Sequence, residues 1–198
     1  MKRFVMLMVV GCAWALGLPP SAAMAQQLVI KSLAEKKVTE LPPGPLFWRL
    51  ENFPALGEAQ AAAGPTALVA QAGGKVWLFT LGPAGGASAG GTKVAEVGPV
   101  PSVVATQYLL RINEASGPPG SVTAVHSHPG SEAFYVLAGE TSSRTPQGVK
   151  RIGAGEGATG HGADTPMQVS SSGSTDLHSL VMFVVDAAKP FSSPANFP

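Results

Sequence analysis

The stretch Gly120–Gly139, GSVTAVHSHPGSEAFYVLAG, is the part of the sequence that most strongly indicates the fold, because it contains two histidines and a carboxylate within a β-rich run. Residues 122–128 have the composition of a strand, and a Pro-Gly-Ser turn signal follows. Residues 132–138 then read as the returning strand of a hairpin. Since side chains alternate across a strand, His126 and His128 share one face of the first strand.

On the returning strand, Glu132 shares a face with Phe134 and Val136, which we expect to line the same pocket. If that face meets the histidine face, two imidazoles and a carboxylate converge among apolar groups. Burying these groups without partners is costly, because each loses its hydration. Two histidines and one carboxylate are a common ligand set for a divalent metal that keeps open positions. The stretch therefore predicts a metal site at His126, His128 and Glu132.

The spacing of five residues in this stretch resembles the first sequence motif of the cupin superfamily. The motif positions are Gly120, His126, His128, Glu132 and Gly139. The resemblance covers roughly residues 100–186 and implies an all-β double-stranded β-helix, or jelly-roll barrel, with metal ligands at the two histidines and the glutamate. The sequence does not select one metal among Zn, Cu, Fe, Mn and Ni. A strand pair with incidental histidines is the alternative.

The second motif of that superfamily is degenerate in this chain. A strict count from Gly155 puts His161 at the motif's proline position and Pro166 at its histidine position. With one inserted residue, Met167 instead replaces the fourth metal ligand. His161 and Met167 are therefore the candidates for a fourth ligand or for pocket lining. We expect a three-ligand site that Met167 lines, with His161 near the rim.

Residues 1–25 have the features of a Sec-type signal peptide, with two basic residues before an apolar run. Ala23-Met24-Ala25 supplies the small-x-small pattern and predicts cleavage before Gln26. The sequence thus predicts a periplasmic or secreted protein with no membrane association after cleavage. Lipoprotein processing at Cys12 is the alternative, although it would leave a very short apolar region.

Composition limits the partners and the chemistry. The net charge of +1 provides neither a basic field for nucleic acid nor a polybasic membrane patch. The one cysteine lies in the predicted signal, so the exported protein would have no disulfide. The sequence has no serine nucleophile elbow, HExxH, CxxC or phosphate loop, which excludes the common hydrolase, zinc-protease and redox classes.

After the signal the chain divides into three parts. Residues 26–65 are an N-terminal arm with a short helix, residues 66–190 are the barrel with its core motif at 120–139, and residues 191–198 are a loose tail. The arm is too apolar for a free segment and is expected to pack on the barrel or on a second subunit, so a homodimer is expected. The arm's apolar residues are Phe47, Trp48, Leu50 and Phe53.

Turn and strand signals complete the pattern. Residues 66–71 and 75–81 read as a hairpin around Gly73-Gly74, and residues 82–98 read as a flexible linker or a lid over the barrel mouth. Residues 103–112 are a strong strand. Residues 177–186 are apolar on both faces, which is typical of a strand in a barrel core.

The resemblance implies an exported, metal-binding cupin that acts on a small organic molecule, as a dioxygenase, an isomerase or a decarboxylase. The alternative is a non-catalytic module that binds a metal or a small ligand, which the degenerate second motif favours. A purely structural jelly roll is the weakest reading, because nothing would then offset the burial of three polar groups.

Overall fold

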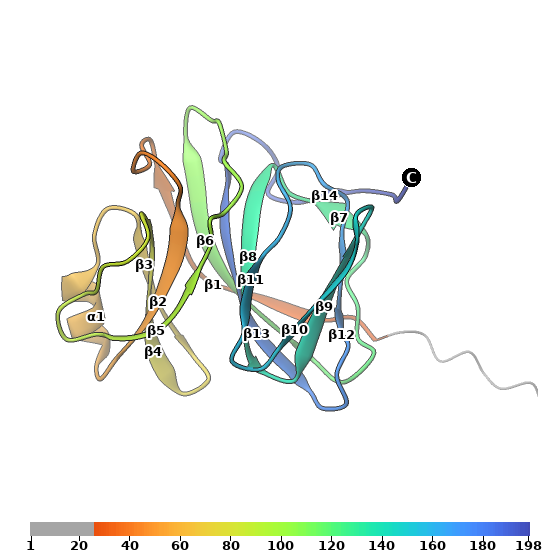
Figure 1. The fold of residues 1–198 in the computed structure, drawn as a ribbon, viewed down its shortest axis with the longest axis horizontal. Coiled ribbons are helices and arrows are strands. Elements are labelled where there is room, and N and C mark those ends of the chain that lie inside the picture. Colours follow the sequence, from red (N-terminus) through yellow and green to blue (C-terminus); the bar gives the residue numbers. More distant parts are fainter. Residues whose placement is uncertain (1–25) are drawn as a thin grey trace, which may run out of the picture.

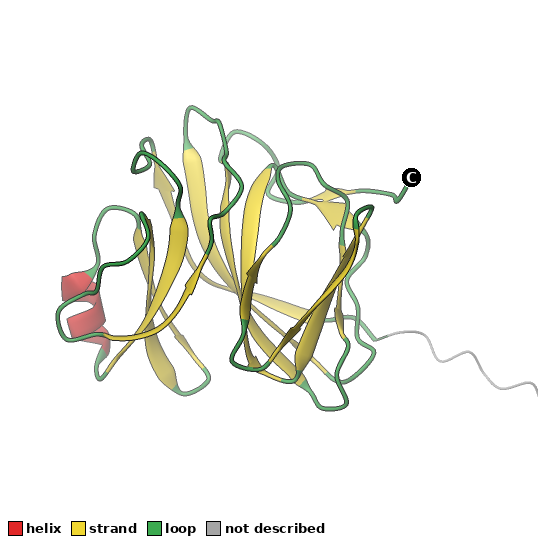
Figure 2. Ribbon diagram, in the orientation of Figure 1, coloured by secondary structure: helices red, strands yellow, loops and turns green. Residues whose placement is uncertain are grey.

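The computed structural model describes residues 26–198, so the predicted signal peptide lies outside the described residues. These residues form layers of β-sheet with one helix on the outside (Figures 1 and 2). The strands are β1 (Val29–Val38), β2 (Phe47–Phe53), β3 (Ala67–Ala72), β4 (Lys75–Gly82), β5 (Thr92–Val97), β6 (Tyr108–Gly117), β7 (His126–Ser127), β8 (Gly130–Ala138), β9 (Glu140–Thr145), β10 (Gly148–Gly153), β11 (Gly157–Thr159), β12 (Gln168–Ser171), β13 (Leu177–Asp186) and β14 (Ser193–Pro194), and the helix is α1 (Leu56–Ala62).

The barrel consists of two facing antiparallel sheets. One has the strand order β1-β6-β13-β8-β11 and the other β10-β9-β12. The segment before β8 extends the second sheet, because Val122 pairs with Ser170 and His126 pairs with Met167. From β6 onward the chain thus passes back and forth between two packed sheets, apart from the hairpin of β9 and β10, as in a jelly roll. The predicted all-β jelly-roll fold is confirmed.

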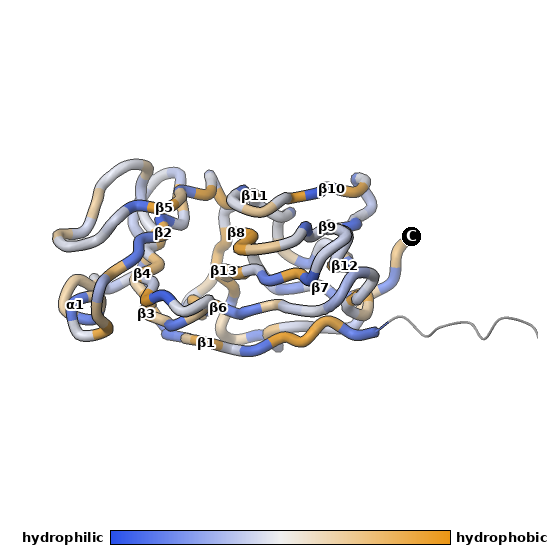
Figure 3. Tube along the Cα trace, turned by 90° about the horizontal axis from the view of Figure 1, so that it is seen from below, coloured by the Kyte–Doolittle hydropathy of each residue, from blue (hydrophilic) through white to orange (hydrophobic). Residues whose placement is uncertain are grey.

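The five-stranded sheet is covered on both faces, which explains the continuous apolar run of β13. Val181 and Phe183 face the barrel interior, whereas Leu180 and Met182 face the N-terminal sheet. Figure 3 views the layers from below and shows apolar residues, in orange, on β8 in the middle layer. The predicted strand at 177–186 has the same bounds as β13.

The hairpin predicted within the motif is wrong in its pairing. β7 pairs with β14, whereas β8 pairs with β13 and β11. The chain crosses from one sheet to the facing sheet at Pro129, so the two motif strands meet face to face rather than edge to edge. A short turn of this composition is compatible with either connection, and the sequence pattern does not distinguish them. The inward faces of both strands still meet in one interior.

The predicted N-terminal arm is not a separate segment in the structure. Its first strand, β1, pairs with β6 in the barrel sheet, and β2 lies inside a four-stranded sheet of order β3-β4-β2-β5. Trp48 and Leu50 of β2 are fully buried against the barrel of the same chain. Their burial within one chain removes the observation on which the expected homodimer rests.

The four-stranded sheet continues through residues that the sequence assigns to the barrel. β3 and β4 form the predicted hairpin, and its turn needs two glycines because Gly73 and Gly74 have φ values of +57° and +70°. α1 confirms the predicted helix and covers the outer face of this sheet through Ala59, beside Phe53 and Leu78. Within residues 26–198 no helix is long and apolar enough to cross a membrane.

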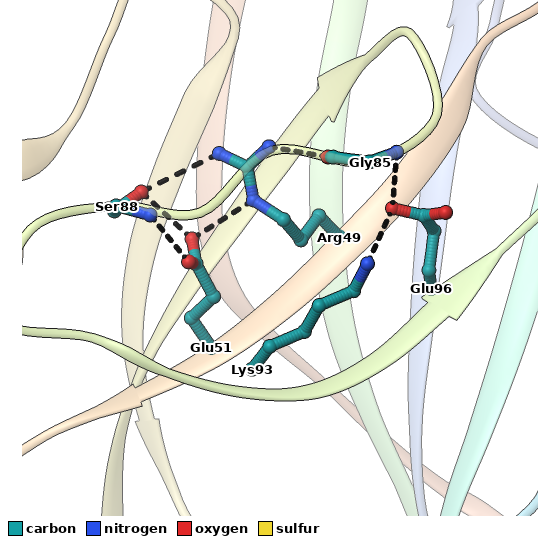
Figure 4. A network of polar contacts seen from close by, with 6 residues as sticks. All are labelled: Arg49, Glu51, Gly85, Ser88, Lys93 and Glu96. Atoms are coloured by element: carbon teal, nitrogen blue, oxygen red, sulfur yellow. Dashed lines mark hydrogen bonds and ion pairs between the residues drawn. The ribbon is translucent and has the colours of Figure 1, made fainter.

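The segment at 82–98 is not a lid over the barrel mouth. Its second half forms β5, which pairs with β2, and its first half is tied down on the N-terminal sheet (Figure 4). Arg49 Nη1 donates to the Gly85 carbonyl at 3.1 Å, and the Ser88 amide and hydroxyl each donate to Glu51 at 2.7 Å. Burial alone raises the pKa of Glu51, but the hydrogen bonds from Ser88 and Arg49 outweigh it and hold the pKa below its usual value.

Changing Glu51 to Gln is expected to lower the free energy of unfolding by about 1.5–3 kcal/mol at neutral pH, because it removes hydrogen bonds to a charged group. The folded-state pKa of Glu51 lies below the ordinary value of 4.5. Its stabilisation is therefore present above the unfolded-state pKa and is lost as the pH falls through the folded-state pKa. Urea unfolding at neutral and acid pH should show a difference between wild type and variant that shrinks in acid. A difference that does not depend on pH would contradict this account.

Candidate functional site

A cavity of about 310 Å³ opens into the barrel interior between the two sheets. Its walls are mainly apolar, and a few polar side chains reach it from both sheets. The lining residues are Ile30, Asn113, Ala115, Thr123, Ala124, His126, His128, Glu132, Phe134, Val169, Val181, Phe183, Phe191 and Ser192. All three predicted metal ligands thus border one cavity, with Phe134 beside them.

A larger cavity of about 430 Å³ lies between the loop after β1 and the segment before β6. Glu40 and Tyr108 are the titratable residues among those that line it. No histidine borders this cavity, so it holds no set of metal ligands. The histidine-lined cavity is therefore the candidate site.

The two histidines lie side by side and have matching hydrogen bonds. Their ring centroids are 5.0 Å apart, with the rings nearly perpendicular at 85°. His126 Nδ1 lies 2.8 Å from the Ala124 carbonyl oxygen, and His128 Nδ1 lies 2.6 Å from the Phe191 carbonyl oxygen. A carbonyl only accepts, so each Nδ1 carries a proton, and in the neutral form of the ring Nε2 then keeps the lone pair. This is the tautomer in which Nε2 can bind a metal.

His128 is held neutral by its surroundings. Burial lowers its pKa to about 4, although the hydrogen bond to Phe191 raises it, and the nearby charges of His126 and Arg111 lower it further. An imidazole that binds a metal must be neutral. At neutral pH His128 is therefore already in the required state.

Glu132 is a buried carboxyl group with an unpartnered oxygen. Its side chain is 2% exposed, and Oε1 has no hydrogen-bond partner. Burial raises the pKa of Glu132 to about 8. Gly160 makes room for this side chain, because a Cβ at that position would lie 2.6 Å from Glu132 Cγ. A buried polar atom without a partner costs about 1–3 kcal/mol or more, and a missing ion or ligand is one explanation for it.

The donor set fits a divalent metal in its chemistry, since two imidazoles that donate through Nδ1 and an unpartnered carboxyl group border one cavity. Among residues 26–198, however, no three His, Cys, Asp or Glu side chains lie close enough together to hold an ion as they stand. Binding would therefore require the side chains to move toward one another. The three residues supply the right atoms but not a closed coordination site.

Neither candidate for a fourth ligand lines the cavity. Met167 is buried and pairs with His126 through backbone hydrogen bonds of 2.8 and 2.9 Å. The Nε2 atom of His161 lies 3.2 Å from the Thr145 hydroxyl, so this ring is engaged elsewhere. Val136 is buried in the barrel core but is not part of the cavity wall.

The sequence also predicts a loose C-terminal tail, and the structure differs. β14 pairs with β7, which carries His126, and Phe191 borders the cavity. Arg144 lies over the ring of Phe197, 4.6 Å from its centroid. The two phenylalanines in an otherwise Pro/Ser-rich segment are the signal that could have indicated docking.

Asn113 is a polar cavity residue that the motif does not include. It comes from β6, and its Oδ1 accepts a hydrogen bond of 2.9 Å from Arg111 Nε. This bond fixes the amide and leaves its NH₂ group as a donor in the cavity that the histidines also line. The residue lies in a strand outside the motif, so no spacing argument points to it.

No protein-family model matches the sequence, and no curated protein matches it. Similar solved structures include a cupin-like protein from Thermotoga maritima, at 13% identity and a TM-score of 0.39, with 44% of this chain and 65% of that chain covered. A second is the DMSP lyase DddQ from Ruegeria pomeroyi, at 20% identity and a TM-score of 0.37, with 43% of each chain covered. A third is an uncharacterized protein with a double-stranded β-helix domain from Klebsiella pneumoniae, at 21% identity and a TM-score of 0.38, with 44% of this chain and 75% of that chain covered.

The protein has a jelly-roll fold. Its own strand order establishes the jelly roll, and the motif histidines and glutamate lie inside it. The chain spans less than two thirds of the Thermotoga and Ruegeria proteins. The jelly-roll barrel is joined to the N-terminal sheet through the apolar residues on the outer face of its five-stranded sheet.

Proposed function

We propose that the protein is exported, that it binds one divalent metal ion through His126, His128 and Glu132, and that it uses the cavity to act on a small organic molecule. The observation that carries the proposal is the unpartnered Glu132 carboxyl group on the same cavity as two histidines whose Nε2 atoms are free. When bound, the metal would supply Lewis-acid or redox chemistry, as in dioxygenation, isomerisation or decarboxylation.

The cavity walls favour a small and mainly apolar molecule. Phe134, Phe183 and Phe191 supply aromatic surface, and neither Lys nor Arg is among the lining residues. Asn113 offers an amide donor that would orient one polar group of the ligand. A volume of about 310 Å³ lies at the small end of the range for ligand pockets.

A non-catalytic module that binds a metal or a small ligand is the second candidate. It is favoured by the degenerate second motif, since neither His161 nor Met167 reaches the cavity as a fourth ligand. Turnover of a small-molecule library by metal-loaded protein would separate catalysis from binding alone.

Export bears on which metal the site receives. We expect a Sec-exported chain to cross the membrane unfolded and to acquire its metal outside the cytoplasm. There the intrinsic affinity order favours Cu and Zn over Mn and Fe. Elemental analysis of protein from its native compartment tests this expectation, and a consistent Mn or Fe content would contradict it.

Replacing His126 or His128 with Ala is expected to weaken Zn²⁺ binding by more than the roughly 10–100-fold that loss of an outer hydrogen-bond partner costs. The β-rich fold should survive, because a chain of this size has a core that does not depend on a metal. Zinc per chain, measured after loading and dialysis, should be one in the wild type and near zero in both variants.

His178→Ala is the matched control, since His178 is paired with Glu114 and does not border the cavity. His161→Ala and Met167→Ala should each change zinc affinity by less than about tenfold, or 1.4 kcal/mol. Full retention of zinc by the His126 and His128 variants would overturn the site. Unfolding of both variants at room temperature would instead make the metal structural.

A further inference from the structure

The C-terminal segment, residues 190–198, lies directly on the candidate site. β14 pairs antiparallel with β7, matching Ser193 with Ser127 and Pro194 with His126. The Ala195 amide adds a hydrogen bond of 3.1 Å to the Val125 carbonyl. The segment thus runs alongside the strand that carries one of the two histidines.

Phe191 contacts the site through both its ring and its backbone. Its ring centroid lies 4.7 Å from that of His128 and 5.0 Å from that of Phe183, and Arg111 Cζ lies 4.4 Å from it on the ring face. Its carbonyl oxygen accepts the hydrogen bond from His128 Nδ1. The ring is held between an arginine, a histidine and a phenylalanine, so the carbonyl is fixed in place by the packing of its own side chain.

The two histidines differ in where their Nδ1 partners come from. The partner of His126 is Ala124, two residues earlier in the same segment, whereas the partner of His128 is 63 residues away in the C-terminal segment. The orientation of the His126 ring is therefore set by a residue of its own segment. That of His128 depends on the docking of the chain end.

We propose that Phe191 is the positioning residue for His128, and that residues 190–198 form a functional part of the wall of the ligand cavity. The Phe191 carbonyl selects the His128 tautomer with a free Nε2, and the Phe191 ring limits the size of the molecule that the cavity admits. An outer hydrogen-bond partner of this kind fixes the tautomer and the ring orientation of a metal-binding histidine. The tautomer of His128 follows from the hydrogen-bond geometry alone. Only the effect of that tautomer on metal affinity rests on the proposed function.

The first test uses metal-free protein that ends at Lys189. Long-range ¹H–¹⁵N spectra of the imidazoles should show His128 protonated at Nδ1 in the wild type and released from that tautomer in the truncated protein. His126 should keep its Nδ1 proton in both, because Ala124 is retained, and it serves as an internal control. An unchanged His128 tautomer after truncation would overturn the proposal.

A second variant keeps the proposal testable if the truncated chain does not fold. Phe191→Ala retains the backbone but loses the ring that anchors it, so His128 should again lose its fixed tautomer, and Phe191→Tyr should restore it. Phe197→Ala is the matched control, since it removes an aromatic ring of the same segment that contacts Arg144 rather than His128. Equal effects of Phe191→Ala and Phe197→Ala on His128 would contradict a positioning role.

Zinc titration supplies the functional readout. Phe191→Ala should weaken Zn²⁺ binding by about 10–100-fold, whereas Phe197→Ala should leave the affinity unchanged. If the wild-type protein binds no zinc, the proposed metal site is wrong. The tautomer measurement on metal-free protein then still tests whether Phe191 positions His128. A Phe191→Ala protein with wild-type zinc affinity and a released His128 would reject the claim that positioning matters for binding.

Discussion

Replacing Trp77 with alanine is expected to lower the free energy of unfolding by about 3–5 kcal/mol. Trp77 lies in β4 and is 1% exposed. Its ring lies 6.0 Å from Phe79 on the same strand and 6.2 Å from Tyr135 on β8 of the barrel, measured between centroids. Its Nε1 donates to the Ala72 carbonyl at 3.0 Å. Alanine would leave a large cavity between the two sheets and remove the donor of that buried bond.

Val149→Ala is the control for this measurement, because Val149 is 61% exposed and its replacement should change the free energy by no more than about 0.5 kcal/mol. Urea unfolding followed by circular dichroism measures both changes. A single transition that moves to lower urea in Trp77→Ala would show that the N-terminal sheet and the barrel unfold as one unit. A loss below about 1 kcal/mol would contradict the shared core.

Replacing Gly139 with alanine is expected to cost about 2–5 kcal/mol. Gly139 has φ +73°, and an added Cβ would lie 2.6 Å from the Asp176 carbonyl oxygen. The free-energy cost of the left-handed conformation and that of the clash add together. The clash is not relieved, because the backbone at the start of β13 cannot move aside as a flexible side chain would. The last glycine of the motif is therefore required by a close approach of two chain segments.

Gly120→Ala is the matched comparison at the other end of the motif. Gly120 has φ +83°, but an added Cβ would meet nothing within 4 Å. Only the conformational cost remains, and we expect a loss of about 1–2 kcal/mol. Thermal and urea unfolding of the two variants should rank Gly139→Ala as clearly less stable. Equal losses would show that crowding at Gly139 contributes nothing.

The sequence predicts those parts of the fold that depend on local pattern. β13 is predicted to the residue because residues 180–185 form a continuous apolar run. The turn at Gly73-Gly74 is predicted because glycine adopts two successive positive φ values at little cost. Beyond that hairpin, the sequence does not predict which strands pair. Pro129 is compatible with a hairpin, yet the chain crosses there to the facing sheet.

The errors in the N-terminal half have the same origin. Trp48 and Leu50 alternate with Arg49 and Glu51, which is a strand pattern, but a proline-rich neighbourhood favours an arm. The partners of β2 are β4 and β5, which lie far along the chain. Long-range pairing of this kind carries no local signal, and the loop residues Gly85 and Ser88 likewise give no sign that Arg49 and Glu51 will hold them.

The sequence likewise predicts only those site residues that belong to one continuous stretch. The motif predicts which residues of one continuous stretch border the cavity, and His126, His128 and Glu132 do so. It does not predict Asn113 or Phe191, because these come from β6 and from the chain end and meet the motif only after folding. The His128 tautomer likewise depends on the Phe191 carbonyl, which lies 63 residues away along the chain and whose position no spacing rule gives.

The most direct measurement of the metal site is an anomalous difference map from crystals of Zn²⁺-loaded protein, recorded on both sides of the zinc absorption edge. We predict one strong peak per chain in the cavity, bonded to Nε2 of His126, Nε2 of His128 and the Glu132 carboxylate, with the Phe191 carbonyl still accepting from His128 Nδ1. A map with no peak in the cavity, or with its strong peak at His161 or His178, would contradict the proposed site.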